Sequence, residues 1–312
     1  EAARAKASAV KLQTYTPDSL TIDCNNQDFI VDGGLWNGMQ LYELYGQAYT
    51  PYEWHKPLFD HARSEGITCF SSPFDTKAVD LLEDLNAPAY KIASFEMIDL
   101  ALIKYVAQTK KPMIISTGMA NYDEISEAIQ CARENGCNDI ILLHCISSYP
   151  APIDSSNLAV ISKLSSEFDV LTGLSDHSLG VAVSIASVAM GACFIEKHFT
   201  LNRDDKGPDS DFSIEPAELT ELVDNANLVS KAIGVPTIGR NATEKSSIKF
   251  RRSLYFVKDI NKGEVICPEH IRSIRPGYGL APKYIDRIIG QKAISDAKYG
   301  DRVNTDYLDN KG

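Results

Sequence analysis

The 312-residue chain carries 31 Lys and Arg against 42 Asp and Glu, a formal net charge of -11. This acidic balance argues against a nucleic-acid partner, because neutralising phosphates requires clustered basic side chains. No apolar run approaches the roughly 18 residues of a membrane span, so we expect no membrane partner. The seven cysteines are odd in number and scattered, which predicts reduced thiols and a cytoplasmic location.

Strand-like apolar runs alternate regularly with amphipathic helical patterns. Seven such units in about 190 residues favour a TIM (β/α)8-type barrel, although the pattern alone leaves an open parallel sheet possible. Residues 1–8 are typical of the end of a helix, so we expect the first of eight strands to lie upstream of this sequence. The runs span residues 9–15, 66–72, 89–95, 112–118, 139–145, 170–176 and 192–198.

The pattern changes after a long helical segment at residues 215–234. We predict a barrel domain over residues 1–235, a polar linker over residues 236–250 and a second domain over residues 251–312. The last region has short, turn-rich segments, which indicate a small, mostly β domain.

Side chains at the carboxyl ends of barrel strands converge on one mouth. Two of them, Lys11 and Lys91, lie at inward-facing strand positions, where a buried ammonium requires either a carboxylate or a bound anion. We favour a bound phosphate, or phosphate plus carboxylate, because several strand-end serines accompany the lysines. Each serine taken singly could instead cap a helix.

Two histidines, His177 and His198, end adjacent strands. Imidazole suits a divalent metal with open positions for water or substrate, and the alternative is two histidines hydrogen-bonded to Asp176 or Glu196. Glu96 could act as a general acid or base at the same mouth, or cap the next helix. The other histidines receive no role: we expect His144 to pack in the interior and His55, His61 and His270 to lie on surfaces.

Several motifs together resemble the sialic acid synthase family over essentially the whole chain. They are KLQTYTPDSLT, CFSSPFD, YKIASFE, IISTGMA, SSYPAP, GLSDHSLG, EKHFT followed by GPDSDFS, and RRSLYF followed by RPGYGLAP. The stretch DGGLWNGMQLYELYGQAYTPYEW (32–54) is most similar to the branch of the family that makes pseudaminic acid. The resemblance implies a barrel followed by an antifreeze-like (SAF) domain, which swaps over the active site of a partner subunit in a homodimer.

The resemblance also implies a reaction and a set of site residues. C3 of phosphoenolpyruvate attacks the aldehyde of an N-acetylated hexosamine, water adds at C2, and phosphate leaves. His177 and His198 then correspond to ligands of a divalent metal (Mn, Mg or Co), and Glu96 to the carboxyl group that handles protons. The implied phosphoenolpyruvate-binding residues are Lys11, Ser72, Lys91, Ser94, Ser116, Ser147 and Ser175, and the implied sugar-binding residues are Gln13, Tyr149, Asp209 and Arg275. Ser147 stands where a relative has Asn.

Some alternatives stay open at the level of sequence. The 32–54 segment predicts 2,4-diacetamido-2,4,6-trideoxy-L-altrose as the acceptor, but an N-acetylneuraminate or legionaminate synthase would share the other motifs. A Schiff-base aldolase using Lys91 or Lys197 is more remote. A non-enzymatic, ice-binding role of the last domain is disfavoured by its many charges. For Asp176 we expect a role in orienting a histidine.

Overall fold

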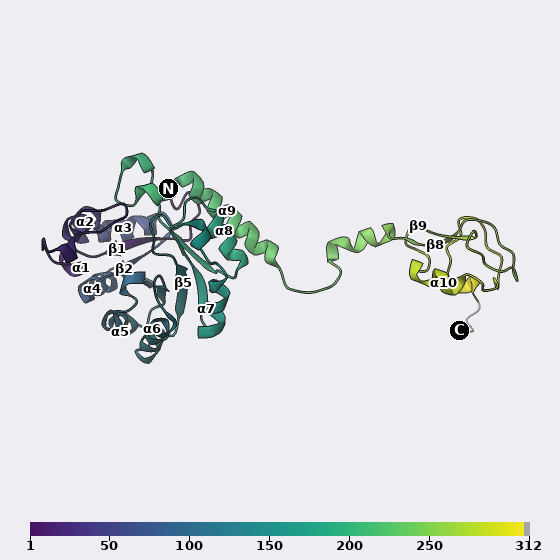
Figure 1. Cartoon of the computed structure of the whole chain (residues 1–312), viewed down its shortest axis with the longest axis horizontal. Helices are drawn as coiled ribbons and strands as arrows, with labels where there is room; N and C mark the ends of the chain where they lie inside the picture. Colours follow the sequence, from purple (N-terminus) through teal and green to yellow (C-terminus); the bar gives the residue numbers. More distant parts are fainter. Residues whose placement is uncertain (309–312) are drawn as a thin grey trace. The chain divides into compact units, whose positions relative to one another are not determined.

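The computed structural model describes residues 1–308 of the chain. The chain forms two compact units, residues 1–234 and residues 235–312, which Figure 1 shows in purple to green and in green to yellow. In the described residues, no helix combines the length and the apolar character needed to cross a membrane.

Seven parallel strands form one sheet in the first unit, in the order of the sequence. Each strand pairs with the next along the chain, as expected when right-handed β–α–β connections follow one another around a barrel. All seven predicted runs contain a strand. These are β1 (Ala9–Thr14), β2 (Thr68–Pro73), β3 (Tyr90–Ile92), β4 (Met113–Ser116), β5 (Ile140–Cys145), β6 (Leu171–Asp176) and β7 (Phe194–Lys197).

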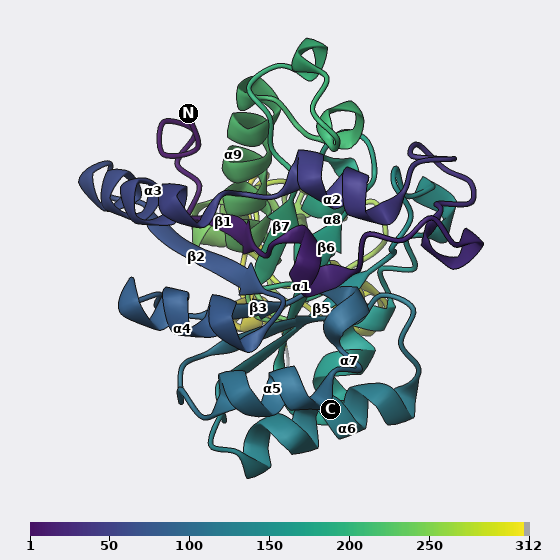
Figure 2. The same ribbon diagram turned by 90° about the vertical axis from the view of Figure 1, so that its left-hand side faces the viewer.

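The two ends of this sheet approach each other. Neighbouring strands lie about 4.8 Å apart, so a flat seven-stranded sheet would separate β1 from β7 by roughly 29 Å. Instead, Lys11 Nζ on β1 lies 3.1 Å from Glu196 Oε1 on β7. The sheet is therefore curled, with the helices outside it (Figure 2), and the predicted TIM-type fold is confirmed. Within the described residues, β1 and β7 each have one strand neighbour.

Several helices cover the outer face of the sheet because they bury an apolar stripe against it. On α4, for example, Val79 and Leu82 join the core that includes Met113 and Ile115 of β4. Asp75 caps the start of α4, and Asn121 with Glu124 forms a capping box on α6. The helices of this unit are α1 (Pro17–Leu20), α2 (Leu41–Ala48), α3 (Tyr52–Ser64), α4 (Thr76–Asp84), α5 (Leu100–Ala107), α6 (Tyr122–Glu134), α7 (Val160–Phe168), α8 (Ala182–Ala189) and α9 (Pro216–Ile233).

Two expectations about the first unit are wrong. Residues 1–8 form turns rather than the end of a helix. Lys6 has a φ of 61°, a left-handed conformation that a right-handed helix cannot continue through. His55, expected on a surface, is completely buried. It lies on the inner face of α3 with Phe59 and Ala62, and its Nε2 lies 2.8 Å from Thr14 Oγ1.

The second unit is small and built around one antiparallel pair of strands, β8 (Ser253–Phe256) and β9 (Ile271–Ile274). Its described residues also contain isolated bridges, a short α-helix, α10 (Ile285–Ile288), and 3-10 helices. Its own core includes Leu254, Phe256 and Ile271. Residues Ala242–Phe250, within the stretch expected to be a linker, form a 3-10 helix.

Candidate active site

The inner face of the barrel changes from apolar to polar within a single two-residue step. Residues two apart in a strand share a face, so the side chain nearer the carboxyl end lies one layer closer to the mouth. The apolar layer fills the interior, and the polar layer forms the floor of the candidate site. The paired positions are Ala9 and Lys11, Phe70 and Ser72, Ile114 and Ser116, Leu143 and Cys145, Gly173 and Ser175, and Phe194 and Glu196.

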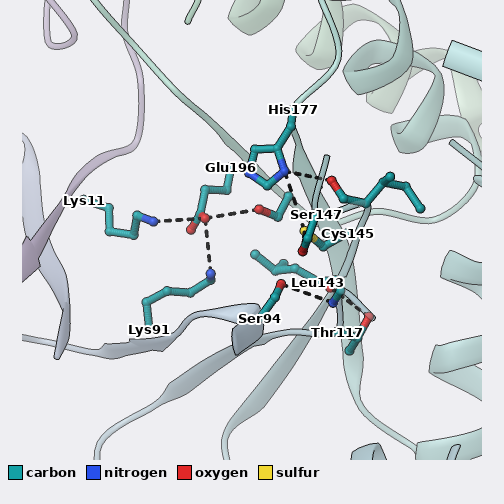
Figure 3. A network of polar contacts seen from close by, with 12 residues as sticks. Lys11, Lys91, Ser94, Thr117, Leu143, Cys145, Ser147, His177 and Glu196 are labelled. Carbon is teal, nitrogen blue, oxygen red and sulfur yellow. Dashed lines mark hydrogen bonds and ion pairs between the residues drawn. The ribbon is translucent and has the colours of Figure 1, made fainter. Parts of the chain in front are cut away.

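Both predicted lysines meet at one carboxylate, Glu196 of β7 (Figure 3). Glu196 Oε1 accepts from Lys11 Nζ at 3.1 Å, from Lys91 Nζ at 3.2 Å and from Ser175 Oγ at 3.2 Å. Burial opposes ionisation of Glu196, but the two lysines hold its pKa well below its usual range. Burial lowers the pKa of Lys91, and the Glu196 charge opposes this shift. Two ammonium groups facing one carboxylate leave an excess positive charge for a bound anion.

Two of the predicted serines present free hydroxyl groups to this charge. Ser72 and Ser116 are buried, and neither Oγ has a hydrogen-bond partner within the described part of the chain. They do not cap helices, because the following helices are capped by Asp75 and Asn121. A buried hydroxyl without a partner is costly, so both atoms are available to hydrogen-bond a ligand or a water molecule.

The side chains of Ser94 and Ser147 both lie close to Gly118. Gly118 N donates to Ser94 Oγ at 3.2 Å. A Cβ atom at position 118 would lie 2.2 Å from Ser147 Oγ and 2.7 Å from Ser94 Oγ. Only glycine therefore allows the loop after β4 to approach both hydroxyl groups.

Glu96 lies in the 3-10 turn η2 (Ser94–Glu96), directly after β3. Its Oε2 is buried and has no hydrogen-bond partner among the described residues. Burial raises its pKa to about 7, although the Lys91 charge opposes this shift. The next helix, α5, is capped by Asp99, which accepts from Leu102 N at 3.0 Å. Glu96 is thus a free carboxyl group that can give or take a proton near neutral pH.

The two predicted metal ligands face each other, with ring centroids 5.3 Å apart. His177 Nδ1 lies 3.0 Å from the main-chain oxygen of Ile146, and His198 Nδ1 lies 3.2 Å from Asp209 Oδ2. Such contacts fix the ring of a metal-binding histidine and leave its Nε2 for the metal. Burial also lowers the pKa of His198, which favours the neutral form that binds metals. The donor set therefore fits a divalent cation.

The protein alone does not complete such a coordination shell. Within residues 1–308, no group of three or more His, Cys, Asp or Glu side chains is arranged to hold a metal. Water or substrate would have to fill the remaining positions, as in an open catalytic site.

Aromatic side chains line the site beside the histidines. The Tyr149 ring centroid lies 4.5 Å from that of His177 and 5.3 Å from that of Phe212. Of the other predicted sugar-binding residues, Asp209 contacts His198 and Gln13 faces the same side as Lys11, opposite Ser72 in the β1–β2 register. Arg275 belongs to the second unit, whereas the other three belong to the first.

The prediction that Asp176 orients a histidine is wrong. Its carboxylate accepts from Lys197 Nζ at 2.9 Å, from Ser184 Oγ at 2.5 Å and from Ser178 N at 2.8 Å. Lys197 also donates to the main-chain oxygen of Ser178. Asp176 and Lys197 are almost completely buried, on the outer face of the sheet beside α8. The side chain of Asp176 points away from the mouth because it alternates with that of Ser175.

From the sequence, Glu196 is considered only as a partner of a histidine, and Cys145 and Trp36 receive no role. Glu196 could have been found, because two inward lysines require a carboxylate and Glu196 shares their face. Cys145 Sγ lies 3.8 Å from both Ser147 Oγ and His177 Nδ1, a proximity that follows only from strand register. The position of Trp36 depends on a long loop, which the sequence pattern does not predict.

A TIM-type barrel with a lysine- and serine-lined mouth, followed by a small β unit, defines the class of protein. The chain belongs to the NeuB family, which matches residues 1–237, and it carries an SAF domain, which matches residues 251–301. The predicted family and the predicted SAF domain are therefore confirmed.

Similar proteins narrow this class to a group of enzymes. The chain is 44% identical over 302 residues to the pseudaminic acid synthase of Campylobacter jejuni, covering 97% of this chain and 88% of that one. It is 43% identical over 305 residues to the pseudaminic acid synthase of Helicobacter pylori, covering 97% and 89%. An N-acetylneuraminic acid synthetase structure from Leptospira borgpetersenii matches with a TM-score of 0.71 and 31% identity, covering 80% and 82%. The chain is an enzyme of this family, and the non-enzymatic interpretation is wrong.

Proposed function

We propose that this enzyme condenses phosphoenolpyruvate with 2,4-diacetamido-2,4,6-trideoxy-L-altrose, forming pseudaminic acid and phosphate. The observation that carries the reaction type is the buried cluster of Lys11, Lys91 and Glu196 beside unpartnered serine hydroxyls. The similarity to two pseudaminic acid synthases supports the choice of acceptor.

Phosphoenolpyruvate carries two anionic groups, a carboxylate and a phosphate. Lys11 and Lys91 supply the charge that attracts them, and buried hydroxyls supply directional hydrogen bonds. Ser72 and Ser116 are suited to this because no described protein group occupies their hydroxyls. The remaining hydroxyls of this anion site are those of Ser94, Ser147 and Ser175.

We assign His177 and His198 as ligands of a divalent metal, with Mn, Mg or Co as candidates. When bound, such a metal polarises the acceptor aldehyde as a Lewis acid. The chain's own contribution is to hold both rings at Nδ1, through Ile146 O and Asp209, so that Nε2 would be the nitrogen that binds the metal.

Glu96 is placed to handle the protons of the reaction. C3 of phosphoenolpyruvate forms a bond to the aldehyde carbon, and the aldehyde oxygen takes up a proton. Water adds to C2, and the C2–O bond to phosphate then breaks, which leaves a 2-keto acid and inorganic phosphate. A carboxyl group with a pKa of about 7 is protonated often enough at neutral pH to donate that first proton.

We also propose that two copies form a domain-swapped homodimer. Three sugar-binding positions, Gln13, Tyr149 and Asp209, lie in the first unit, whereas Arg275 lies in the second. Exchange of SAF domains would place Arg275 at the acetamido group of the sugar in the partner's site. Sedimentation of the wild type tests this, and a monomer at micromolar concentration would contradict it.

Phosphate release with alternative acceptors tests the proposed reaction. The wild type is incubated with phosphoenolpyruvate and either the diacetamido trideoxy sugar or N-acetylmannosamine, with and without EDTA. We expect phosphate release to require an acceptor, to favour the diacetamido sugar and to stop with EDTA until metal is restored. Preference for N-acetylmannosamine would overturn the acceptor alone, and trapping of a pyruvate adduct by borohydride would instead support an aldolase.

A further inference from the structure

The segment before α2 forms a closed loop whose tip carries Trp36. Val31 N donates to Met39 O at 2.9 Å and Gly38 N donates to Val31 O at 2.8 Å, which ties the two ends of the loop together. Gly38 has a φ of +84°, a conformation that L side chains rarely adopt. The loop therefore has a defined shape.

Trp36 joins this loop to two other segments of the candidate site. Its Nε1 donates to the main-chain oxygen of Pro208 at 3.3 Å, next to Asp209, which holds His198. Its ring centroid lies 6.0 Å from that of Tyr149. The indole is only partly buried, so part of its surface is free to meet a ligand.

These contacts make Trp36 the outer end of a continuous aromatic wall. Tyr149 packs on His177, and Phe212 packs on both Tyr149 and His198. Among the contacts described for Trp36, none involves the lysines or serines of the anion site. A ligand that touches Trp36 would therefore be the sugar rather than phosphoenolpyruvate.

We propose that Trp36 is a specificity-determining residue that contacts the apolar face and the C6 methyl group of the acceptor. This inference rests on the proposed function. Aromatic rings gain from contact with apolar surface, and a hydroxymethyl group in place of the methyl would bring a polar oxygen to the indole. One group of this size changes kcat/KM by about 10- to 200-fold.

The kinetic test uses the only other tryptophan of the chain as a matched control. Trp54 lies on α3 and is 58% exposed, so Trp54→Phe should leave both KM values unchanged. Trp36→Ala should raise KM for the diacetamido sugar about 10-fold or more, with KM for phosphoenolpyruvate changed less than about twofold. Trp36→Phe, which keeps a ring, should raise KM for the diacetamido sugar by less than Trp36→Ala does. The preference for this sugar over N-acetylmannosamine should be unchanged in Trp54→Phe, reduced in Trp36→Phe and reduced most in Trp36→Ala.

A binding measurement removes the dependence on turnover. Trp54→Phe leaves Trp36 as the single tryptophan of the chain, and titration with the diacetamido sugar alone should change its fluorescence. An unchanged spectrum despite binding seen by calorimetry would overturn the inference, as would equal effects of Trp36→Ala on both KM values. Failure of the wild type to turn over either acceptor would overturn the proposed function and the inference together, whereas unaltered acceptor kinetics of Trp36→Ala would overturn the inference alone.

Discussion

Two buried ion clusters contain adjacent residues of β7, Glu196 and Lys197. They differ in how many of their polar atoms have hydrogen-bond partners. The closed cluster, Asp176 and Lys197 with Ser184 and the main chain of Ser178, gives both carboxylate oxygens a partner. The open cluster, Glu196 with Lys11, Lys91 and Ser175, leaves Glu196 Oε2 without one among the described residues. Because successive strand residues point to opposite faces, the first lies against α8 and the second lines the barrel interior.

This difference separates a structural role from a functional one. Burial of charge alone does not mark a site, since both clusters are buried. What distinguishes the open cluster is a charged group with an unpartnered oxygen, which is costly unless a ligand or a water molecule completes it.

The largest expected effect is on the closed cluster. Lys197→Met leaves Asp176 buried without its counter-ion, and we expect a loss of about 3–5 kcal/mol in the free energy of unfolding, measured by chemical denaturation. Adding Asp176→Asn should recover part of this loss, because no charge then remains buried. Lys91→Met is the comparison in the open cluster. It leaves Lys11 paired with Glu196, so it should cost less stability but reduce kcat/KM for phosphoenolpyruvate strongly. Equal losses of stability in Lys197→Met and Lys91→Met would contradict the distinction between the closed and the open cluster.

Glu96 is a second buried carboxyl group with an unpartnered oxygen among the described residues, and its role can be tested through pH. Glu96→Gln should lower kcat by about 100-fold or more, and the residual activity should lose the decline above pH 7. The substitution also changes how the stability of the folded protein depends on pH. Because the folded pKa is raised from 4.5 to about 7, the folded state holds the proton more tightly, and wild-type stability falls as pH rises across this range. The melting temperature of the variant, relative to that of the wild type, should therefore be higher at pH 8 than at pH 5. A pH-independent difference would contradict the assigned pKa.

The smallest effects come from a matched pair of serines. Ser184→Ala removes the hydrogen bond to Asp176 and should cost about 1–3 kcal/mol of stability. Ser116→Ala removes a buried hydroxyl that lacks a partner, so the unliganded protein should be as stable as the wild type or more so. The same variant should show a smaller rise in melting temperature with phosphoenolpyruvate, because ligand stabilisation follows affinity. Destabilisation by Ser116→Ala without a weaker ligand effect would show that its hydroxyl is structural.

Much of the barrel could be predicted from sequence because its periodicity is local. Residues 113–115, for example, have both faces of the strand buried and are all apolar, and flanking caps such as Asn121 mark where helices begin. The turn at residues 1–8 was missed because a positive φ at Lys6 leaves no trace in an alanine-rich pattern.

The candidate site could be predicted only as a set of strand ends. Face alternation placed Lys11 and Lys91 toward the interior, but Glu196 as their partner depends on the curl of the sheet, a property of all seven strands. The same applies to Asp176, whose partners lie on β7 and α8. His55 was misplaced because its burial depends on which face of α3 meets the sheet.

Gly118 has no side chain, yet it can constrain the site as tightly as a residue that carries a functional group. Its φ is not among the positive values that favour glycine, so the need for glycine comes from its neighbours rather than from a left-handed backbone. Any side chain would displace the hydroxyls of Ser94 and Ser147. In a saturation library, position 118 should therefore resemble the lysine positions in its loss of activity, while its variants accumulate as folded protein.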